Sequence, residues 1–242
     1  MIEKITLSPS KLSLLKECER CFFDTNVLGI KRPRGIFPSL PGGMDRMMKA
    51  YSNQYRGDLP PVLKGIVPGV LHPDGAKIKK WQYWRTAPRY FDAELNVEVY
   101  GAIDDMLIQP NKSVDPLDFK TKGSMPKTDG SEYYQLQMDI YNLLFASNGF
   151  KINNRAFLAY LWPNLAEDEV NYINHEKAPD EIVTIFKVKV FELKCDTDRA
   201  KETISRAVKI LRGKRPKPSL TCEVCSYQDA KNELTKEHQK EN

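Results

Sequence analysis

The sequence predicts an α/β (α+β) fold in which helices flank a central mixed β-sheet. Segments with the apolar spacing of helices alternate with segments rich in β-branched residues, in the order helix, strands, helix, strands, helix. The chain has 242 residues, which is enough to bury a substantial core. Because no repeat and no linker divides the chain, we expect residues 1–242 to form a single domain.

Composition and charge narrow the class of protein. Charged residues make up 29% of the chain, hydrophobic residues make up 41%, and the formal net charge is +5. This mild basic excess permits a nucleic-acid partner without requiring one. No apolar run approaches the length that spans a membrane, so no membrane partner is expected. The N-terminal segment lacks the apolar core of a signal peptide, which predicts a cytoplasmic protein.

The N-terminal third is expected to be helical and then irregular. A first helix begins at Ser8, which is a suitable N-cap, with Pro9 in the first turn. A proline- and glycine-rich stretch over residues 31–43 ends this region, and a second helix is expected around 44–55. Residues 57–75 are expected to be irregular because proline and glycine recur there.

Strands are expected from about residue 90. Polar and apolar residues alternate over 94–100, and the apolar pattern continues over 103–108. After a turn, residues 113–120 form the next strand. The remaining predicted elements are a helix over 131–147 ended by Asn148 and Gly149, strands over 155–162 and 182–193, a helix capped by Thr197 or Asp198 that runs to about 212, and a polar tail over 231–242.

Two short segments with acidic residues follow neighbouring predicted strands. They are Gly-Ala-Ile-Asp at 101–104 and Asp-Phe-Lys at 118–120. A hairpin between these strands would bring Asp104, Asp118 and Lys120 to one edge of a sheet. Carboxylates are the ligands that Mg²⁺ and Mn²⁺ prefer, and an ammonium beside them can hold an attacking water. Taken singly, each residue could be a strand-end surface charge; taken together, they predict a site for phosphodiester hydrolysis.

This pattern resembles the PD-(D/E)XK nuclease superfamily, and within it the RecB-like branch. That branch includes the RecB and AddB nuclease domains and the small RecB-like nucleases of CRISPR adaptation modules. The order and spacing are similar to the motifs G-x-x-D at 101–104, D-x-K-T at 118–123 and Q-x-x-x-Y at 137–141. The segment 7–12 and the cysteine after it are also similar. The resemblance covers about residues 7–227, nearly the whole chain.

The resemblance implies a restriction-endonuclease-like core and a metal-dependent DNA nuclease, an Mg/Mn-dependent deoxyribonuclease. It implies single-stranded DNA or DNA ends as the substrate, and protein partners in repair or CRISPR adaptation. It also implies that Asp104, Asp118 and the backbone carbonyl of Phe119 hold Mg²⁺ or Mn²⁺. The catalytic residues implied in this way are Asp104, Asp118, Lys120, Gln137 and Tyr141.

One departure from the family pattern leaves an alternative open. Many RecB-like nucleases have a histidine in the helix upstream of G-x-x-D, and here Asp45 stands near that place. Asp45 is therefore either a replacement metal ligand or an ordinary carboxylate near a helix N-terminus. The missing histidine favours the alternative function, a catalytically weak or inactive nuclease-fold DNA-binding subunit of a repair or CRISPR-adaptation complex.

The cysteines predict a second metal site. An odd count of five argues against a disulfide framework, and the fifth cysteine, Cys195, has no partner at ligand spacing. A shared metal would clamp residues 1–30 against 213–230. Four thiolates suit zinc or an iron–sulfur cluster equally well; the resemblance favours a [4Fe–4S] cluster, while the two-plus-two arrangement keeps zinc open. The two pairs are Cys18-x-x-Cys21 and Cys222-x-x-Cys225.

Basic residues interleaved with aromatics are candidates for DNA contacts, because such mixtures suit phosphates and stacked bases. The simpler interpretation is a solvated charged surface. The candidates are Lys79, Lys80, Trp81, Trp84, Arg85 and Lys122.

Overall fold

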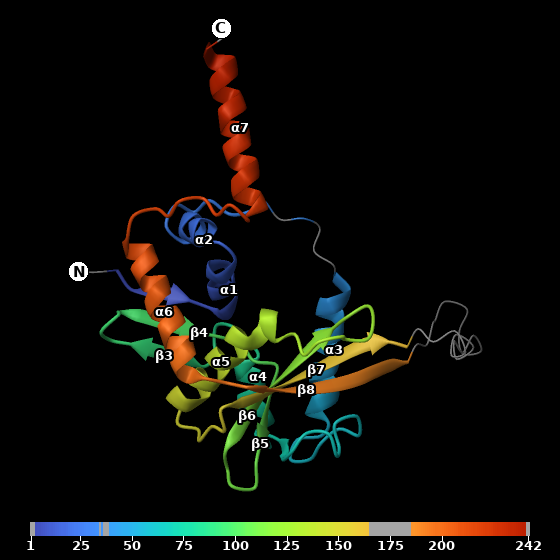
Figure 1. Ribbon diagram of the computed structural model, residues 1–242. Helices are drawn as coiled ribbons and strands as arrows, with labels where there is room; N and C mark the ends of the chain where they lie inside the picture. The colour runs from blue at the N-terminus through green and yellow to red at the C-terminus, as the bar shows by residue number, and fades with distance from the viewer. Residues whose placement is uncertain (1–2, 34, 36–38, 165–184, 241–242) are drawn as a thin grey trace.

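The computed structural model describes residues 3–33, 35, 39–164 and 185–240, with side chains described as far as 235. Helices flank two mixed sheets, so the predicted mixed α/β class is confirmed (Figure 1). The strands do not form one central sheet, however, because they divide between a three-stranded and a five-stranded sheet. Within the described residues, no helix combines the length and apolar character needed to cross a membrane.

The N-terminal region contains a short strand and two helices, β1 (Ile5–Leu7), α1 (Pro9–Glu17) and α2 (Glu19–Asn26). Ser8 caps α1 as predicted, since its side chain accepts a hydrogen bond from the N–H of Lys11. The single helix predicted here is wrong, because the backbone of Cys18 is extended and divides it in two. Cys18 then caps α2 by accepting from the N–H of Cys21.

The next elements are α3 (Ser39–Asn53), β2 (Val70–Leu71) and α4 (Gly75–Trp81). Helix α3 begins five residues before the predicted start, because a proline is tolerated in a first helical turn and Met44 and Met48 bury the helix against the core. The stretch predicted to be irregular over 57–75 contains β2, and α4, which was not predicted, begins at its last residue. Asp74 caps it by accepting from the N–H of Lys77 at 2.9 Å.

The strands form two sheets. The smaller sheet has the order β1-β4-β3, with β1 parallel to β4. The larger sheet has the order β2-β5-β6-β7-β8, in which only β6 and β7 run parallel. Residues 182–184 of the last predicted strand lie outside the described residues. The strands are β3 (Arg89–Asp92), β4 (Val97–Tyr100), β5 (Asp105–Ile108), β6 (Val114–Thr121), β7 (Arg155–Pro163) and β8 (Phe186–Lys194).

Three further helices are α5 (Ser131–Ser147), α6 (Thr197–Arg212) and α7 (Glu223–Lys240). Helix α5 has the predicted bounds. The predicted cap of α6 is wrong by one residue, because the side chain of Asp196 accepts from the N–H groups of Asp198 and Arg199. Helix α7 projects away from the sheets and includes most of the predicted polar tail (Figure 1).

Helices cover both faces of the five-stranded sheet at β6. Because side chains alternate along a strand, the polar residues of β6 lie on one of these faces. Leu117 and Phe119 pack in a cluster with Met44 and Met48 of α3. The intervening residues of β6 therefore point to the opposite face, where α5 packs against the strand. This arrangement directs Asp118 toward α5.

Candidate active site and four-cysteine centre

The structure brings Asp104, Asp118 and Lys120 together. Asp104 follows β4, and its Oδ2 accepts a hydrogen bond from the N–H of Phe119 at 2.9 Å. Asp118 lies on β6 and is 1% exposed. The Nζ atom of Lys120 lies 2.6 Å from Asp118 Oδ2. The hairpin from β5 to β6 thus gathers two carboxylates and one ammonium, as the sequence predicts.

Helix α5 adds Gln137 and Tyr141 to this group. The amide nitrogen of Gln137 donates to Asp118 Oδ1 at 3.4 Å and to the Tyr141 hydroxyl oxygen at 2.8 Å. Its amide oxygen accepts from Lys120 Nζ at 3.2 Å. The Tyr141 hydroxyl donates to the backbone carbonyl of Ala102 at 2.6 Å. Gln137 therefore connects the acid, the lysine and the tyrosine in one hydrogen-bonded network.

Gly101 allows α5 to lie this close to the end of β4. A Cβ atom at Gly101 would lie 3.0 Å from Tyr141 Cε1, 3.1 Å from Leu144 Cδ1 and 3.3 Å from Pro9 Cγ. These distances are shorter than ordinary van der Waals contacts, and two of the three neighbours are themselves buried. The glycine of the G-x-x-D segment therefore sets the distance between Tyr141 and the acidic residues.

We expect Gly101→Ala to lower the free energy of unfolding by about 1–3 kcal/mol, since the added methyl group overpacks the contact with α5. Urea unfolding followed by circular dichroism measures this loss. Gly123→Ala is the control, because a Cβ there would meet nothing within 4 Å. An equal effect of the two substitutions would contradict the packing role of Gly101.

Burial and like charge act together on the two carboxylates. Burial, and then repulsion from Asp104, raises the pKa of Asp118 to about 7, although Lys120 acts in the opposite direction. Burial by itself lowers the pKa of Lys120, but attraction from Asp118 outweighs it and raises the pKa overall. Burial, followed by the charges of Asp118 and Asp104, raises the pKa of Tyr141 well above its usual value. Tyr141 therefore remains a hydrogen-bond donor.

Lys49 is a site residue that the sequence did not reveal. It lies on α3, and its Nζ is 2.9 Å from Asp104 Oδ1 and 2.8 Å from Asp45 Oδ1. Burial lowers the pKa of Lys49, but Asp104 and Asp45 more than offset this and raise it. Asp45, for which the sequence left open either a replacement metal ligand or an ordinary carboxylate, is thus linked to Asp104 through one ammonium. The only sequence signal was the i,i+4 spacing of Asp45 and Lys49, which usually marks a surface ion pair.

The donor set fits a hard divalent cation. Asp118 Oδ2 is buried and has no hydrogen-bond partner with acceptable geometry among the described residues, although Lys120 lies beside it. The carboxylate of Asp104 lies beside Asp118, since its Oδ2 accepts from the N–H of Phe119. Oxygen donors of this kind suit Mg²⁺ and Mn²⁺, and a cation between them would relieve the repulsion that raises the pKa of Asp118.

The backbone carbonyl of Phe119 is directed to the same edge of β6. The N–H of Phe119 donates to Asp104, and the N–H and C=O of one strand residue point to the same side of the strand. This orientation agrees with the predicted role of the carbonyl as a ligand. The role itself stays a prediction.

The four-cysteine centre joins two segments that are distant in the sequence. The four Sγ atoms all lie within 4.8 Å of one another, and all four residues are buried. The closest pairs are Cys18–Cys225 at 3.6 Å, Cys21–Cys222 at 3.7 Å and Cys21–Cys225 at 3.7 Å. Four thiolates arranged tetrahedrally around one Zn²⁺ at about 2.3 Å stand ~3.8 Å apart. An iron–sulfur cluster contains several irons and sulfides and requires the thiolates to stand farther apart.

The surroundings of the cysteines act differently on the four thiols: burial raises the pKa of Cys21 and raises the pKa of Cys225 to about 12, whereas the pKa of Cys222 is lowered. Each pair lies at the N-terminus of a helix, α2 or α7, where the helix dipole favours negative charge. Burial raises the pKa of Cys222, but the N–H of Cys225 and the neighbouring thiols outweigh it and lower the pKa to about 7. Arg32 donates to Cys222 Sγ at 3.5 Å. Cys195 is buried elsewhere and has no part in this cluster.

The predicted DNA-contact residues have different environments. Trp81 stacks on Phe145 with ring centroids 5.8 Å apart and packs against the core, so its ring is not a free surface for a base. Trp84 is 52% exposed. Lys79, Lys80 and Arg85 are exposed, and Lys122 is partly buried, with its Nζ 5.1 Å from the centre of the Tyr160 ring.

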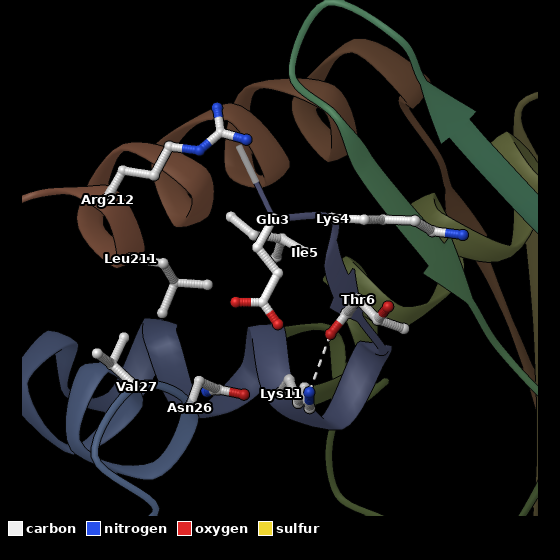
Figure 2. A pocket seen from close by; sticks show the side chains of 9 residues that line it. All are labelled: Glu3, Lys4, Ile5, Thr6, Lys11, Asn26, Val27, Leu211 and Arg212. Carbon is white, nitrogen blue, oxygen red and sulfur yellow. Dashed lines mark hydrogen bonds between the residues drawn. The ribbon is translucent and has the colours of Figure 1, made fainter. Parts of the chain in front are cut away.

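A separate pocket of about 440 Å³ lies between β1, α1, α2 and α6 (Figure 2). Glu3 points into it, and Lys11 donates to the backbone carbonyl of Thr6 at its side. None of its lining residues belongs to the acid–lysine site or to the four-cysteine centre. The pocket therefore does not mark the candidate active site.

Comparison with known proteins identifies the fold family. A family model described as the PD-(D/E)XK nuclease superfamily matches residues 44–230. A search of curated protein sequences found no match. A solved structure titled "Crystal structure of SSO0001" aligns over 89% of this chain and 81% of its own chain, with 14% sequence identity and a TM-score of 0.39.

Proposed function

This chain belongs to the PD-(D/E)XK nuclease superfamily, and from that premise we propose that it is an Mg²⁺- or Mn²⁺-dependent deoxyribonuclease. Members of the superfamily are generally nucleases that use divalent metals. The observation that supports catalysis in this chain is the convergence of Asp104, Asp118 and Lys120, with Gln137 bound to both of the last two.

We assign a different role in catalysis to each residue of the site. Asp104, Asp118 and the Phe119 carbonyl would hold the divalent cation, which supplies Lewis-acid stabilisation of negative charge on the phosphate. Lys120 would orient the attacking water and offset charge beside the scissile phosphate. Gln137 holds the Lys120 ammonium in place. Tyr141 anchors Gln137 and the backbone just before Asp104.

Metal binding can be measured without cleavage. At a Mn²⁺ concentration of about 100 times Kd, binding to the folded state should add about 2.7 kcal/mol, which corresponds to a rise in melting temperature of roughly 5–10 °C for a domain of this size. Asp118→Asn should lose most of this rise, because a neutral amide replaces one buried carboxylate.

The matched control for this measurement is Asp198→Asn, which changes an exposed carboxylate on α6. Its metal-dependent rise should equal that of the unaltered protein. A full rise in the Asp118 variant would contradict the proposed ligand set.

The proposed substrate is single-stranded DNA or DNA with free ends, in the setting of repair or CRISPR adaptation. End-labelled single- and double-stranded DNA incubated with Mg²⁺ or Mn²⁺ tests the proposal. Cleavage that requires metal and prefers single strands or ends supports it. Metal-independent cleavage, or cutting confined to duplex interiors, counts against it.

A DNA-binding subunit with a weakened nuclease core is the second candidate. The observation that favours it is the environment of Asp45, which stands where family members have a histidine and is held by Lys49. DNA binding with no turnover under Mg²⁺ or Mn²⁺ would decide for this candidate.

The four-cysteine cluster is proposed to hold one metal centre that clamps residues 1–30 to 213–230. The sulfur separations fit a single zinc ion, whereas the RecB-like resemblance implies a [4Fe–4S] cluster. Anaerobic purification with metal analysis and a visible spectrum separates the two. Stoichiometric zinc in a colourless sample supports zinc, while iron with broad visible absorption supports the cluster. Absence of both metals would contradict the centre.

A further inference from the structure

A group of aromatic rings and arginines lies on the surface beside the three-stranded sheet. The Trp84 and Tyr100 ring centroids are 6.3 Å apart. The guanidinium carbon of Arg85 lies 4.9 Å from the centre of the Trp84 ring, and that of Arg89 lies 5.4 Å from the centre of the Tyr100 ring. Tyr83 adjoins Trp84 at 6.1 Å. We call these five residues the aromatic strip.

Two of the three rings of the aromatic strip, Tyr83 and Trp84, are exposed, and the third, Tyr100, is partly buried. Trp84 is 52% exposed and Tyr83 is 45% exposed. Their neighbour Trp81 differs, since it packs against Phe145 and Phe150. Large aromatic rings gain stability by burial, so a cluster of exposed rings is a feature that folding does not explain.

The charge of the strip is positive. Among the described residues, no carboxylate forms an ion pair with Arg85, whose Nη1 donates to the Tyr83 hydroxyl. Arg89 and Lys4 both pair with Glu98, at 2.6 and 3.0 Å. The one carboxylate of Glu98 is therefore shared by two cations, and Arg85 adds a third positive charge that has no ion-pair partner among the described residues. This excess suits a polyanion that lies across the rings.

The aromatic strip is attached directly to the candidate active site. The side-chain amide of Gln82 donates to the backbone carbonyl of Asp104 at 2.7 Å, and the N–H of Ile103 donates to the carbonyl of Trp81 at 3.1 Å. These bonds hold the segment before Trp84 against the segment that carries Asp104. Tyr100 precedes Asp104 by four residues, a span of at most ~14 Å.

We propose that the aromatic strip binds unpaired bases of single-stranded DNA and leads the strand to the acid–lysine site. Bases stack on Trp84 and Tyr100, while Arg85 and Arg89 contact phosphates. Single strands are favoured because the faces of paired bases are already stacked within a duplex. The path to the active site rests on the proposed nuclease function, whereas binding to the strip does not.

Binding is tested with a fluorescein-labelled oligothymidylate and a duplex of equal length, in buffer without Mg²⁺ or Mn²⁺ so that no cleavage occurs. Trp84→Leu and Tyr100→Leu should each weaken single-strand binding about 5- to 150-fold, the range for loss of one stacked base. Single-strand binding should also quench tryptophan emission, and Trp84→Leu should remove most of the quenching, since Trp81 is partly buried against Phe145 and Phe150 and Trp162 is buried.

Tyr227→Leu is the matched control, because Tyr227 is 69% exposed on α7, which projects away from the sheets (Figure 1). It should bind the oligonucleotide as the unaltered protein does. Arg85→Gln provides a second test that leaves the aromatic rings in place, and it should weaken binding and reduce its dependence on salt. Unchanged single-strand affinity in the Trp84 and Arg85 variants, or equal losses for single strand and duplex, would overturn the proposal.

The two proposals fail in different ways. If the protein cleaves DNA but Trp84→Leu binds and quenches normally, the aromatic strip is wrong and the nuclease assignment stands. If the strip variants lose binding but no metal supports cleavage, the nuclease assignment fails and the strip remains a single-strand binding surface.

Discussion

Replacement of Lys120 by alanine is expected to lower kcat/KM for DNA cleavage by about 10²- to 10⁴-fold, the range for loss of a positioned proton-transfer or charge-stabilising group. The side chain is largely buried, its ammonium lies 2.6 Å from Asp118 Oδ2, and Gln137 holds it at 3.2 Å. No other described lysine makes both of these contacts. Single-turnover cleavage of end-labelled DNA under Mn²⁺ measures the loss.

Folding and binding must be separated from catalysis in this experiment. Circular dichroism and the melting temperature establish that the Lys120 variant is folded, and binding measured without Mg²⁺ or Mn²⁺ establishes that it still holds DNA. Lys151→Ala is the control, because this lysine is exposed and outside the site. Cleavage by the Lys120 variant at the unaltered rate would falsify the catalytic assignment.

Loss of one cluster cysteine should have the largest effect on stability. A crosslink that closes a loop of this length contributes roughly 5 kcal/mol in the chain-entropy model. For a domain of this size, that loss lowers the melting temperature by roughly 10–20 °C. Cys222→Ser should therefore release the metal and show such a fall, measured by metal analysis and differential scanning calorimetry.

Cys195→Ser is the control, because it removes a buried thiol without removing a residue of the four-cysteine cluster. Cys195 is 3% exposed, as buried as Cys18, but it stands outside the cluster. Its variant should keep the full metal content. Equal metal content in the Cys222 and Cys195 variants would show that the cluster is not a metal centre.

Sequence patterns within short segments predicted much of the fold and the proximity of the main candidate site residues. The helix over 131–147 has the right bounds because its apolar spacing, its length and the glycine beyond its end all agree. Asp104, Asp118 and Lys120 meet because one hairpin connects them, and short connections leave little freedom in their placement. Contacts of this kind depend on residues close in sequence.

Other features depended on contacts between distant parts of the chain. Lys49 reaches Asp104 only because α3 packs across the five-stranded sheet, which its own sequence does not encode. Trp81 and Trp84 look alike in the sequence, yet Trp81 is partly buried against Phe145 and Phe150, whereas Trp84 is 52% exposed. The division of the first helix follows from Cys18, whose side chain caps α2. Tertiary packing decided all three.

The separation of 201 positions between Cys21 and Cys222 has a consequence for biosynthesis. A ribosome that adds 5–20 residues per second needs roughly 10–40 s to make that stretch. During this interval the first cysteine pair has emerged without the second, and two thiolates alone offer a metal only half of its ligands. The proposed centre can therefore form only after Cys225 has been made, and oxidation of the first cysteine pair in that interval would prevent its assembly.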